Sequence, residues 1–257
     1  MRLRVIGRSS PYAGPGDATV GYVIEGEDGH FLLECGTGVV AKYLEHYSLA
    51  DLKGIVVSHL HPDHSADLFP LGFAIKHAVM QGLRQNRVPL FLPSGGVDTF
   101  SVALKAFGDL GAHYSEVFAY EEYDDKSRVA IGGWSIHFPK VYHGMNGHGV
   151  VIEGEQGERL GYTGDTKMGG NLASFFQGND LLLCEATVET AEQGEATGHL
   201  TAEQAGELAT VAQVSQLVLT HFLPGTDVEE KQRLAAMHFP GSIATAEVGK
   251  VYSIRAQ

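Results

Sequence analysis

Four side chains of the kinds that bind metal ions lie close together in this sequence. His59, His61, Asp63 and His64 fill the pattern H-x-H-x-D-H, which follows an apolar, β-branched run at 54–57. Residues two apart on an extended backbone share a face, so His59 and His61 point in the same direction. The turn that follows presents Asp63 and His64 from a second side. Because imidazole and carboxylate groups together suit zinc, manganese or iron better than calcium, the stretch predicts a metal site that can serve two neighbouring cations.

Three further polar side chains come directly after runs with the composition of buried strands. His143 follows the strand-like stretch 134–138, Asp165 follows 159–162, and His221 ends the run Leu-Val-Leu-Thr-His. Loops at strand ends are where a rigid scaffold holds binding groups. An Asp flanked by Gly and Thr is well placed to bridge two cations with its two oxygens. These three residues are therefore expected to join the metal site.

The H-x-H-x-D-H stretch resembles the signature of the metallo-β-lactamase superfamily. The resemblance implies an α/β (α+β) protein, a four-layer αββα sandwich of two mixed β-sheets with a one- or two-metal hydrolytic centre along one edge. It also implies a ligand order that this sequence fills: the motif, then a His, then Gly-Asp-Thr, then a strand-terminal His. The implied cofactors are two divalent metal ions, Zn²⁺ first, with Mn²⁺ or Fe as alternatives. The implied ligands are His59, His61 and His143 for one metal, Asp63, His64 and His221 for the other, with Asp165 as the bridge.

Two later stretches resemble the ribonuclease Z-like branch of this superfamily: Cys-Glu185-Ala-Thr and Gly-His199-Leu-Thr. In that branch the corresponding Glu orients the corresponding His near the scissile phosphate, so Glu185 and His199 are expected to act as a catalytic proton-transfer pair. A carboxylate on one ring nitrogen makes the other a well-aimed donor, suited to an alkoxide leaving group. His199 can also be a helix-entry residue, because Thr201 and Gln204 form a capping box.

The elements that must position these residues can be assigned from apolar periodicity and turn residues. Strands are expected at 2–7, 18–24, 31–33, 54–57, 88–92, 116–120, 134–138, 150–153, 159–162 and 217–221, and helices at 39–47, 68–79, 97–110 and 201–211. The strands at 116–120 and 134–138 are assigned to a second sheet. Without an internal repeat or a linker, residues 1–257 are expected to form a single domain. Glu34 either supports the metals or is a plain strand-end carboxylate.

Composition restricts the partners and the compartment. The chain has 31 acidic and 18 basic residues and a formal net charge of −13. Such a surface repels a nucleic-acid backbone, and basic residues are not concentrated locally, so strong general nucleic-acid binding is not expected. No membrane association is expected either, since no run approaches the ~18 apolar residues of a membrane span and no signal-peptide pattern occurs. Two cysteines, Cys35 and Cys184, favour a reducing cytoplasm over a disulfide scaffold.

The function predicted from these features is that of a dinuclear metal-dependent hydrolase, most directly a phosphodiesterase. Its substrate would be a small or cyclic phosphodiester or a short nucleic acid, attacked by a metal-bridged hydroxide that Asp63 and Asp165 orient. Asp165 follows His143 by 22 positions, which leaves no room for the tRNA-gripping arm that bacterial ribonuclease Z usually carries there. The alternatives are a tRNA 3′-processing endoribonuclease, a lactonase or thioesterase on the same fold, and a non-catalytic metal-binding protein.

Three residues near these motifs and the oligomeric state stay open. His148 follows a glycine in a loop near the site, where it either touches substrate or packs. Lys140 and Lys167 lie close in sequence to metal-binding motifs and either meet a phosphate or are ordinary surface lysines. The resemblance to the branch implies a homodimer.

Overall fold

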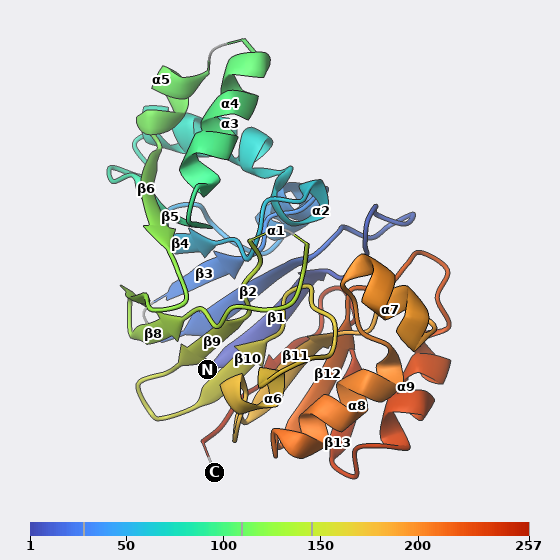
Figure 1. Ribbon diagram of the computed structural model, residues 1–257. Coiled ribbons are helices and arrows are strands. Elements are labelled where there is room, and N and C mark those ends of the chain that lie inside the picture. Colours follow the sequence, from blue (N-terminus) through green and yellow to red (C-terminus); the bar gives the residue numbers. More distant parts are fainter. Residues whose placement is uncertain (28, 109, 145, 257) are drawn as a thin grey trace.

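The computed structural model describes residues 1–27, 29–108, 110–144 and 146–256. Within these ranges the strands form two seven-stranded sheets that pack face to face, with helices on the outside (Figure 1). The first sheet has the order β14 (Val251–Ser253), β1 (Arg2–Gly7), β2 (Gly21–Gly26), β3 (Gly29–Leu33), β4 (Leu52–Val56), β5 (Val88–Pro93) and β6 (Phe118–Tyr123). The second has the order β13 (Ser242–Thr245), β12 (Gln216–Thr220), β11 (Leu181–Glu185), β10 (Arg159–Tyr162), β9 (Val150–Glu153), β8 (Trp134–His137) and β7 (Arg128–Ile131).

Each sheet is antiparallel in one half and parallel in the other. Strands β14, β1, β2 and β3 pair antiparallel, whereas β3, β4, β5 and β6 pair parallel. In the second sheet β7 to β10 pair antiparallel, and β10 to β13 pair parallel. The carboxyl ends of parallel strands lie at one edge of a sheet, where ligands of open α/β sheets bind. The segments after β4, β10, β11 and β12 carry most polar residues of the candidate site, and the segment after β8 carries His143.

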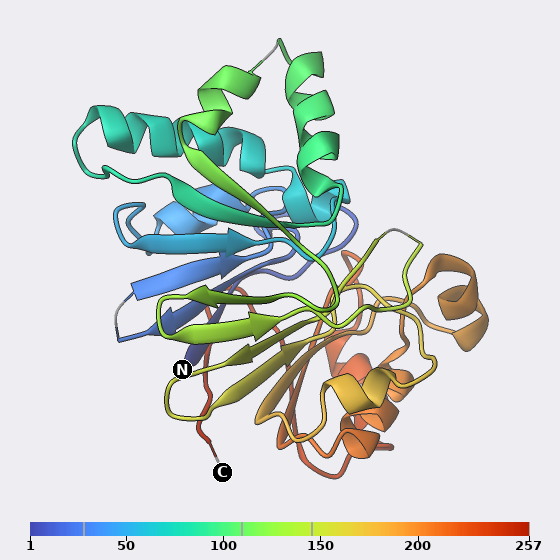
Figure 2. The same ribbon diagram turned by 60° about the vertical axis from the view of Figure 1, so that its left-hand side comes forward.

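Helices cover the outer faces of both sheets, as the two views show (Figures 1 and 2). Helices α3, α4 and α5 lie over the first sheet, and α6, α8 and α9 lie over the second. The bounds of the helices are α1 (Val39–Leu44), α2 (Pro62–Ser65), α3 (Leu68–Met80), α4 (Gly96–Ala106), α5 (Gly111–Ser115), α6 (Leu172–Phe175), α7 (Ala191–Thr197), α8 (Ala202–Val211) and α9 (Val228–Ala236).

The apolar core follows these layers. One cluster of buried side chains, which includes Phe31, Trp134 and Tyr162, lies between the two sheets. A second joins the first sheet to its helices, and a third joins the second sheet to α6, α8 and α9. Strand β11 reads Leu-Leu-Leu-Cys-Glu and is buried at every position, as expected for a parallel strand covered on both faces. The predicted four-layer αββα sandwich is therefore confirmed.

Several expected elements differ from the observed ones. The assignment of the strand at 116–120 to the second sheet is wrong: β6 pairs in parallel with β5 and extends the first sheet. The crossover through α4 and α5 returns the chain to the same sheet, which the strand's own pattern cannot indicate. The helix expected over 97–110 ends at Ala106. The capping box of Thr201 and Gln204 is confirmed. No helix in the described part of the chain has both the length and the apolar character to span a membrane.

Candidate active site

The H-x-H-x-D-H motif begins just after β4 and continues into the short helix α2. Gly54, Ile55 and Val56 are buried strand residues, and Pro62 opens α2, a position where its missing N–H costs nothing. The side chains of the motif lie close to polar side chains from loops that follow strands of the second sheet. The site therefore combines loops from both sheets.

The first part of this cluster contains His59, His61, His143 and Asp165, whose potential ligand atoms all lie within 4.8 Å of one another. His61 Nδ1 lies 3.0 Å from His59 Nε2 and 3.3 Å from His143 Nε2. Asp165 Oδ2 lies 3.6 Å from His59 Nε2 and 3.9 Å from His143 Nε2. Three imidazoles and one carboxylate oxygen thus converge on one point.

The second part contains Asp63, His64 and His221, which also meet within 4.8 Å. His64 Nε2 and His221 Nε2 are 3.2 Å apart. Asp165 Oδ1 lies 3.3 Å from His64 Nε2 and 3.0 Å from His221 Nε2. Asp165 therefore turns one oxygen toward each part of the cluster, the arrangement that a bridging ligand requires.

The chemistry of the buried groups fits cations at both places. Oδ1 of Asp165 lacks a well-aligned hydrogen bond among the described residues, although two imidazole nitrogens lie within 3.3 Å of it and Asp165 is only 3% exposed. His143 Nδ1 lies 3.0 Å from the Gly198 carbonyl, which can only accept, so in the neutral ring Nε2 offers its lone pair to the cluster. A buried carboxylate oxygen and an imidazole lone pair without donors are costly unless a cation neutralises them. The set of nitrogen and oxygen donors suits zinc, manganese or iron.

Burial and the close packing of these groups shift the pKa values in the cluster. Burial and the facing imidazole of His64 lower the pKa of His59 well below its usual value. Burial alone would raise the pKa of Asp165, but His221 and His64 beside it lower that pKa well below its usual value. Burial alone would lower the pKa of His64, but Asp165 and Glu34 on its two sides raise it well above the usual value. Ionised carboxylates and neutral imidazoles are the forms that bind metals, and a cation would displace the proton of His64.

Surrounding groups orient the ligand side chains from outside. Ser10 Oγ donates to Asp63 Oδ2 at 2.9 Å. Glu34 is buried, accepts from the Ser58 N–H, and lies 3.4 Å from Nδ1 of His64. Glu34 has a φ of 63° and His221 a φ of 64°, so two of the few left-handed non-glycine residues belong to this site. Such backbone conformations persist where the surrounding structure holds them, often at functional sites.

Glu185 and His199 form the expected pair at the edge of the cluster. Nδ1 of His199 lies 3.1 Å from each carboxylate oxygen of Glu185, which is completely buried at the end of β11. Burial alone would lower the pKa of His199, but the hydrogen bond to Glu185 and its charge raise that pKa to about 9. The His199 ring lies 5.1 Å from that of His143 and 5.4 Å from that of His221. Its side chain is 16% exposed, so the ring borders both parts of the cluster and solvent.

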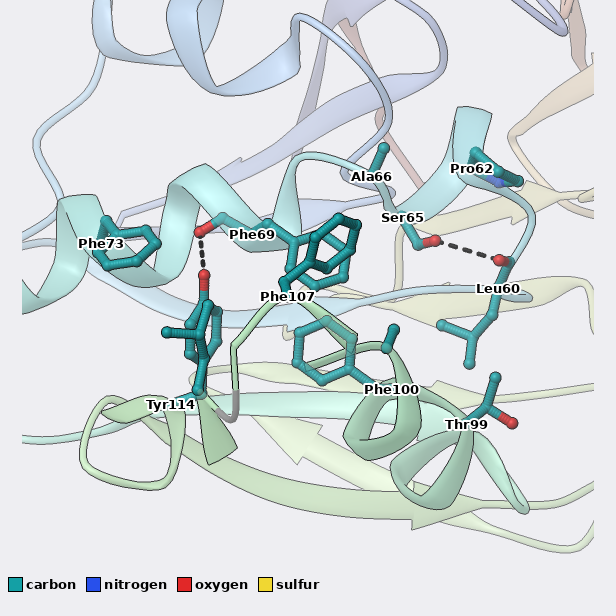
Figure 3. A pocket seen from close by; sticks show the side chains of 12 residues that line it. Leu60, Pro62, Ser65, Ala66, Phe69, Phe73, Thr99, Phe100, Phe107 and Tyr114 are labelled. Atoms are coloured by element: carbon teal, nitrogen blue, oxygen red, sulfur yellow. Dashed lines mark hydrogen bonds between the residues drawn. The ribbon is translucent and has the colours of Figure 1, made fainter. Parts of the chain in front are cut away.

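The loop that carries the motif has an apolar rear face. Leu60, Pro62, Ser65 and Ala66 alternate with the polar residues and line a cavity of about 650 Å³ (Figure 3). Aromatic side chains from α3 and α4 and from the segment around α5 form the opposite wall. Ser65 Oγ donates to the carbonyls of Leu60 and His61, at 3.2 Å and 3.0 Å. These hydrogen bonds and the packing at the rear hold the ligand-bearing loop in place.

Three residues with open roles do not join the cluster. His148 is only 2% exposed, and its ring packs edge-on against Tyr123, with centroids 5.3 Å apart. Lys167 forms an ion pair with Glu195 at 2.6 Å. Lys140 is exposed, and its backbone forms an isolated antiparallel β-bridge with that of His148. The structure thus gives His148 a packing environment and the lysines surface positions.

Sequence reasoning missed two residues of the site. Ser10 lies 53 positions before Asp63, and no local pattern indicates that the first loop reaches the metal motif. Thr187 belongs to the Cys-Glu-Ala-Thr stretch, which by itself indicates no role for the threonine. Its hydroxyl lies 2.5 Å from Glu185 Oε2 and 2.7 Å from His221 Nδ1. The spacing of two residues from Glu185 at a strand end was the signal that could have identified it.

Comparisons with known proteins show the family to which this sequence is similar. The family model described as "Beta-lactamase superfamily domain" matches residues 29–222. The probable metallo-hydrolase YhfI of Bacillus subtilis (strain 168) is 26% identical over 253 residues, which cover 98% of this chain and 99% of YhfI. A ribonuclease Z of Mycobacterium bovis (strain BCG / Pasteur 1173P2) is 27% identical over 274 residues, with 97% of this chain and 95% of that protein covered.

Two solved structures have the same fold. The crystal structure of YhfI from Bacillus subtilis superimposes with a TM-score of 0.89 at 24% identity, covering 98% of each chain. A diphosphatase from the PhnP family superimposes with a TM-score of 0.78 at 15% identity, covering 99% of this chain and 98% of that one. At these identities the likeness concerns the fold.

Proposed function

The chain belongs to the β-lactamase superfamily, and we propose that within it the protein is a dinuclear metal-dependent phosphodiesterase. Its substrate would be a small or cyclic phosphodiester or a short nucleic acid. The observation that carries the proposal is the Glu185–His199 pair, which lies against a cluster able to hold two cations. The cluster alone supports hydrolysis in general, whereas an oriented proton donor beside it favours a substrate with a strongly basic leaving oxygen.

The residues of the cluster divide into two metal-binding sets. His59, His61 and His143 would hold one divalent cation, Asp63, His64 and His221 the other, and Asp165 would contact both. Zinc is the first candidate for both positions, because neutral imidazole and carboxylate are its usual ligands beside thiolate. When bound, the two cations supply positive charge that offsets the charge of a phosphodiester and activate the attacking water.

The chain's own proton donor is His199. Its Nδ1 is held by Glu185, so its Nε2–H is the group left to face a ligand. Because the ring lies beside His143 and His221, a phosphodiester held at the cluster places its leaving oxygen within reach of this ring. The carboxylate of Glu185 also stabilises the imidazolium and fixes its orientation, since Glu185 accepts a second hydrogen bond from the Thr166 N–H at 2.7 Å.

The surface charge favours a small substrate over a large polyanion. The net charge of −13 opposes a nucleic-acid backbone that extends beyond the site. Because a ribonuclease Z is similar to this chain, tRNA 3′ processing is the second candidate function. A short substrate needs only the two cations and His199 for recognition of its phosphate, whereas a precursor tRNA needs a basic surface as well.

A substrate screen with metal-loaded protein tests the proposal. The panel contains bis(p-nitrophenyl) phosphate, cyclic nucleotides, a short RNA, a precursor tRNA, a lactone, a thioester and nitrocefin, each with zinc, manganese and cobalt. We expect metal-dependent cleavage of the diesters without turnover of nitrocefin. Cleavage of the lactone or thioester alone would overturn the phosphodiesterase assignment, and specific cleavage confined to precursor tRNA would replace it by the endoribonuclease alternative.

A further inference from the structure

A threonine hydroxyl links the two functional halves of this site. Thr187 Oγ1 lies 2.5 Å from Oε2 of Glu185 and 2.7 Å from Nδ1 of His221. All three side chains are buried, with exposed fractions of 6%, 0% and 1%. Because water has little access to them, these hydrogen bonds decide how the groups are oriented.

The direction of each hydrogen bond follows from the donors available. A carboxylate can only accept, so the single hydroxyl proton of Thr187 goes to Glu185. The oxygen of Thr187 must then accept the proton that His221 carries on Nδ1. In the neutral ring this places the lone pair on His221 Nε2, the atom that lies 3.0 Å from Asp165 Oδ1 and 3.2 Å from His64 Nε2.

The fold explains why this contact forms. Glu185 ends β11, and Thr187 follows it by two residues, so both side chains can turn to the same side of the chain. Glu185 lies in register with Thr220 of the neighbouring strand β12, and His221 is the next residue. The left-handed backbone at His221 then directs its ring back toward Thr187.

We propose that Thr187 is a positioning residue: it fixes the Nδ1–H tautomer of His221, so that the single carboxylate of Glu185 sets both the proton donor His199 and the ligand His221. The inference rests on the ligand role given to His221 in the proposed function, and it does not depend on which substrate is cleaved. Groups that orient a metal-binding histidine from outside typically change metal affinity by about 10–100-fold when they are removed. Loss of the hydroxyl should therefore lower the affinity for the cation at Asp63, His64 and His221 more than the affinity for the other cation.

Metal titration of two matched variants tests this inference. Thr187→Val keeps the shape and removes the hydroxyl, whereas Thr187→Ser keeps the hydroxyl. Calorimetric titration of the metal-free proteins with Zn²⁺ should give two sites in the wild type and in Thr187→Ser. In Thr187→Val one site should weaken about 10–100-fold. Equal affinities in Thr187→Val and the wild type would overturn the role of Thr187 alone, and a wild type without metal binding would overturn the ligand assignment as well.

A second measurement keeps the inference testable if Thr187→Val does not fold. Nitrogen NMR of ¹⁵N-histidine-labelled, metal-free wild-type protein reports which ring nitrogen of His221 carries the proton, with His221→Gln used for assignment. We expect a proton on Nδ1. A neutral His221 protonated only on Nε2 would overturn the inference, because Thr187 would then have no proton to accept.

Discussion

The carboxylate of Glu34 lies 3.4 Å from Nδ1 of His64, on the opposite side of the ring from Asp165. Both residues are completely buried, and the backbone of Glu34 adopts a φ of 63°. The carboxylate therefore supports the ring from behind while Nε2 faces the cluster. Of the two roles open for Glu34 in the sequence, the geometry favours support of the metal site over a plain strand-end carboxylate.

Glu34→Gln tests this support, because it keeps the size of the side chain and removes its charge. We expect the affinity for one of the two cations to fall about 10–100-fold, since the imidazole of His64 loses its charged partner. Zinc titration of the variant checks the result, with Glu45→Gln, an exposed helix-end residue, as the matched control. Unchanged affinity in Glu34→Gln would show that the carboxylate is not part of the metal site.

Asp165→Asn tests the bridging position. The substitution keeps the shape of the side chain but replaces one of the two oxygens and removes the charge that faces both sets of histidines. We expect the metal content measured by plasma emission spectroscopy to fall from two ions per chain to one or none. Asp124→Asn, on the exposed turn after β6, is the matched control. A count that stays at two would refute the assignment of Asp165.

The stability of the protein should depend on pH through buried histidines away from the cluster. Burial lowers the pKa of His30, whose Nε2 lies 2.7 Å from the Tyr43 hydroxyl. Below a pH of about 6.5 the unfolded chain gains a proton at this position that the folded state resists, so stability falls as the pH falls. One such group changes the free energy of unfolding by at most about 1.4 kcal/mol per pH unit.

His30→Gln isolates that contribution, because the amide can still form a hydrogen bond with the Tyr43 hydroxyl and does not titrate. The free energy of unfolding, measured in urea on the metal-free protein from about pH 8 to about pH 5, on either side of the ordinary histidine pKa, should decline less steeply for His30→Gln than for the wild type. Parallel declines in the two proteins would mean that His30 keeps an ordinary pKa in the folded state.

The local motif allowed much of this site to be predicted, because ligands that follow strand ends carry their own context. Two groups of possible ligand residues contain those expected from H-x-H-x-D-H, His143, Asp165 and His221, and a third places His199 with Asp165 and His221. Their roles as metal ligands stay predictions. Contacts between distant loops could not be predicted in this way: the hydrogen bond of Ser10 to Asp63 depends on how the first sheet folds over the motif. Sequence alone also could not place β6, since pairing partners are not encoded in the apolar pattern of a single strand.

The dependence of His199 on the leaving group tests the central claim most directly. The measurement compares kcat/KM of the wild type and His199→Ala, both metal-loaded, on bis(p-nitrophenyl) phosphate and on a cyclic nucleotide. The p-nitrophenolate group can leave without being protonated, whereas an alkoxide needs a proton to leave. We therefore expect kcat/KM of His199→Ala to fall about 10²–10⁴-fold on the cyclic nucleotide and far less on the aryl diester. His46→Ala, an exposed histidine outside the site, should behave as the wild type on both. Equal losses on the two substrates, or no loss on either, would contradict the role of His199 as the proton donor of a phosphodiesterase.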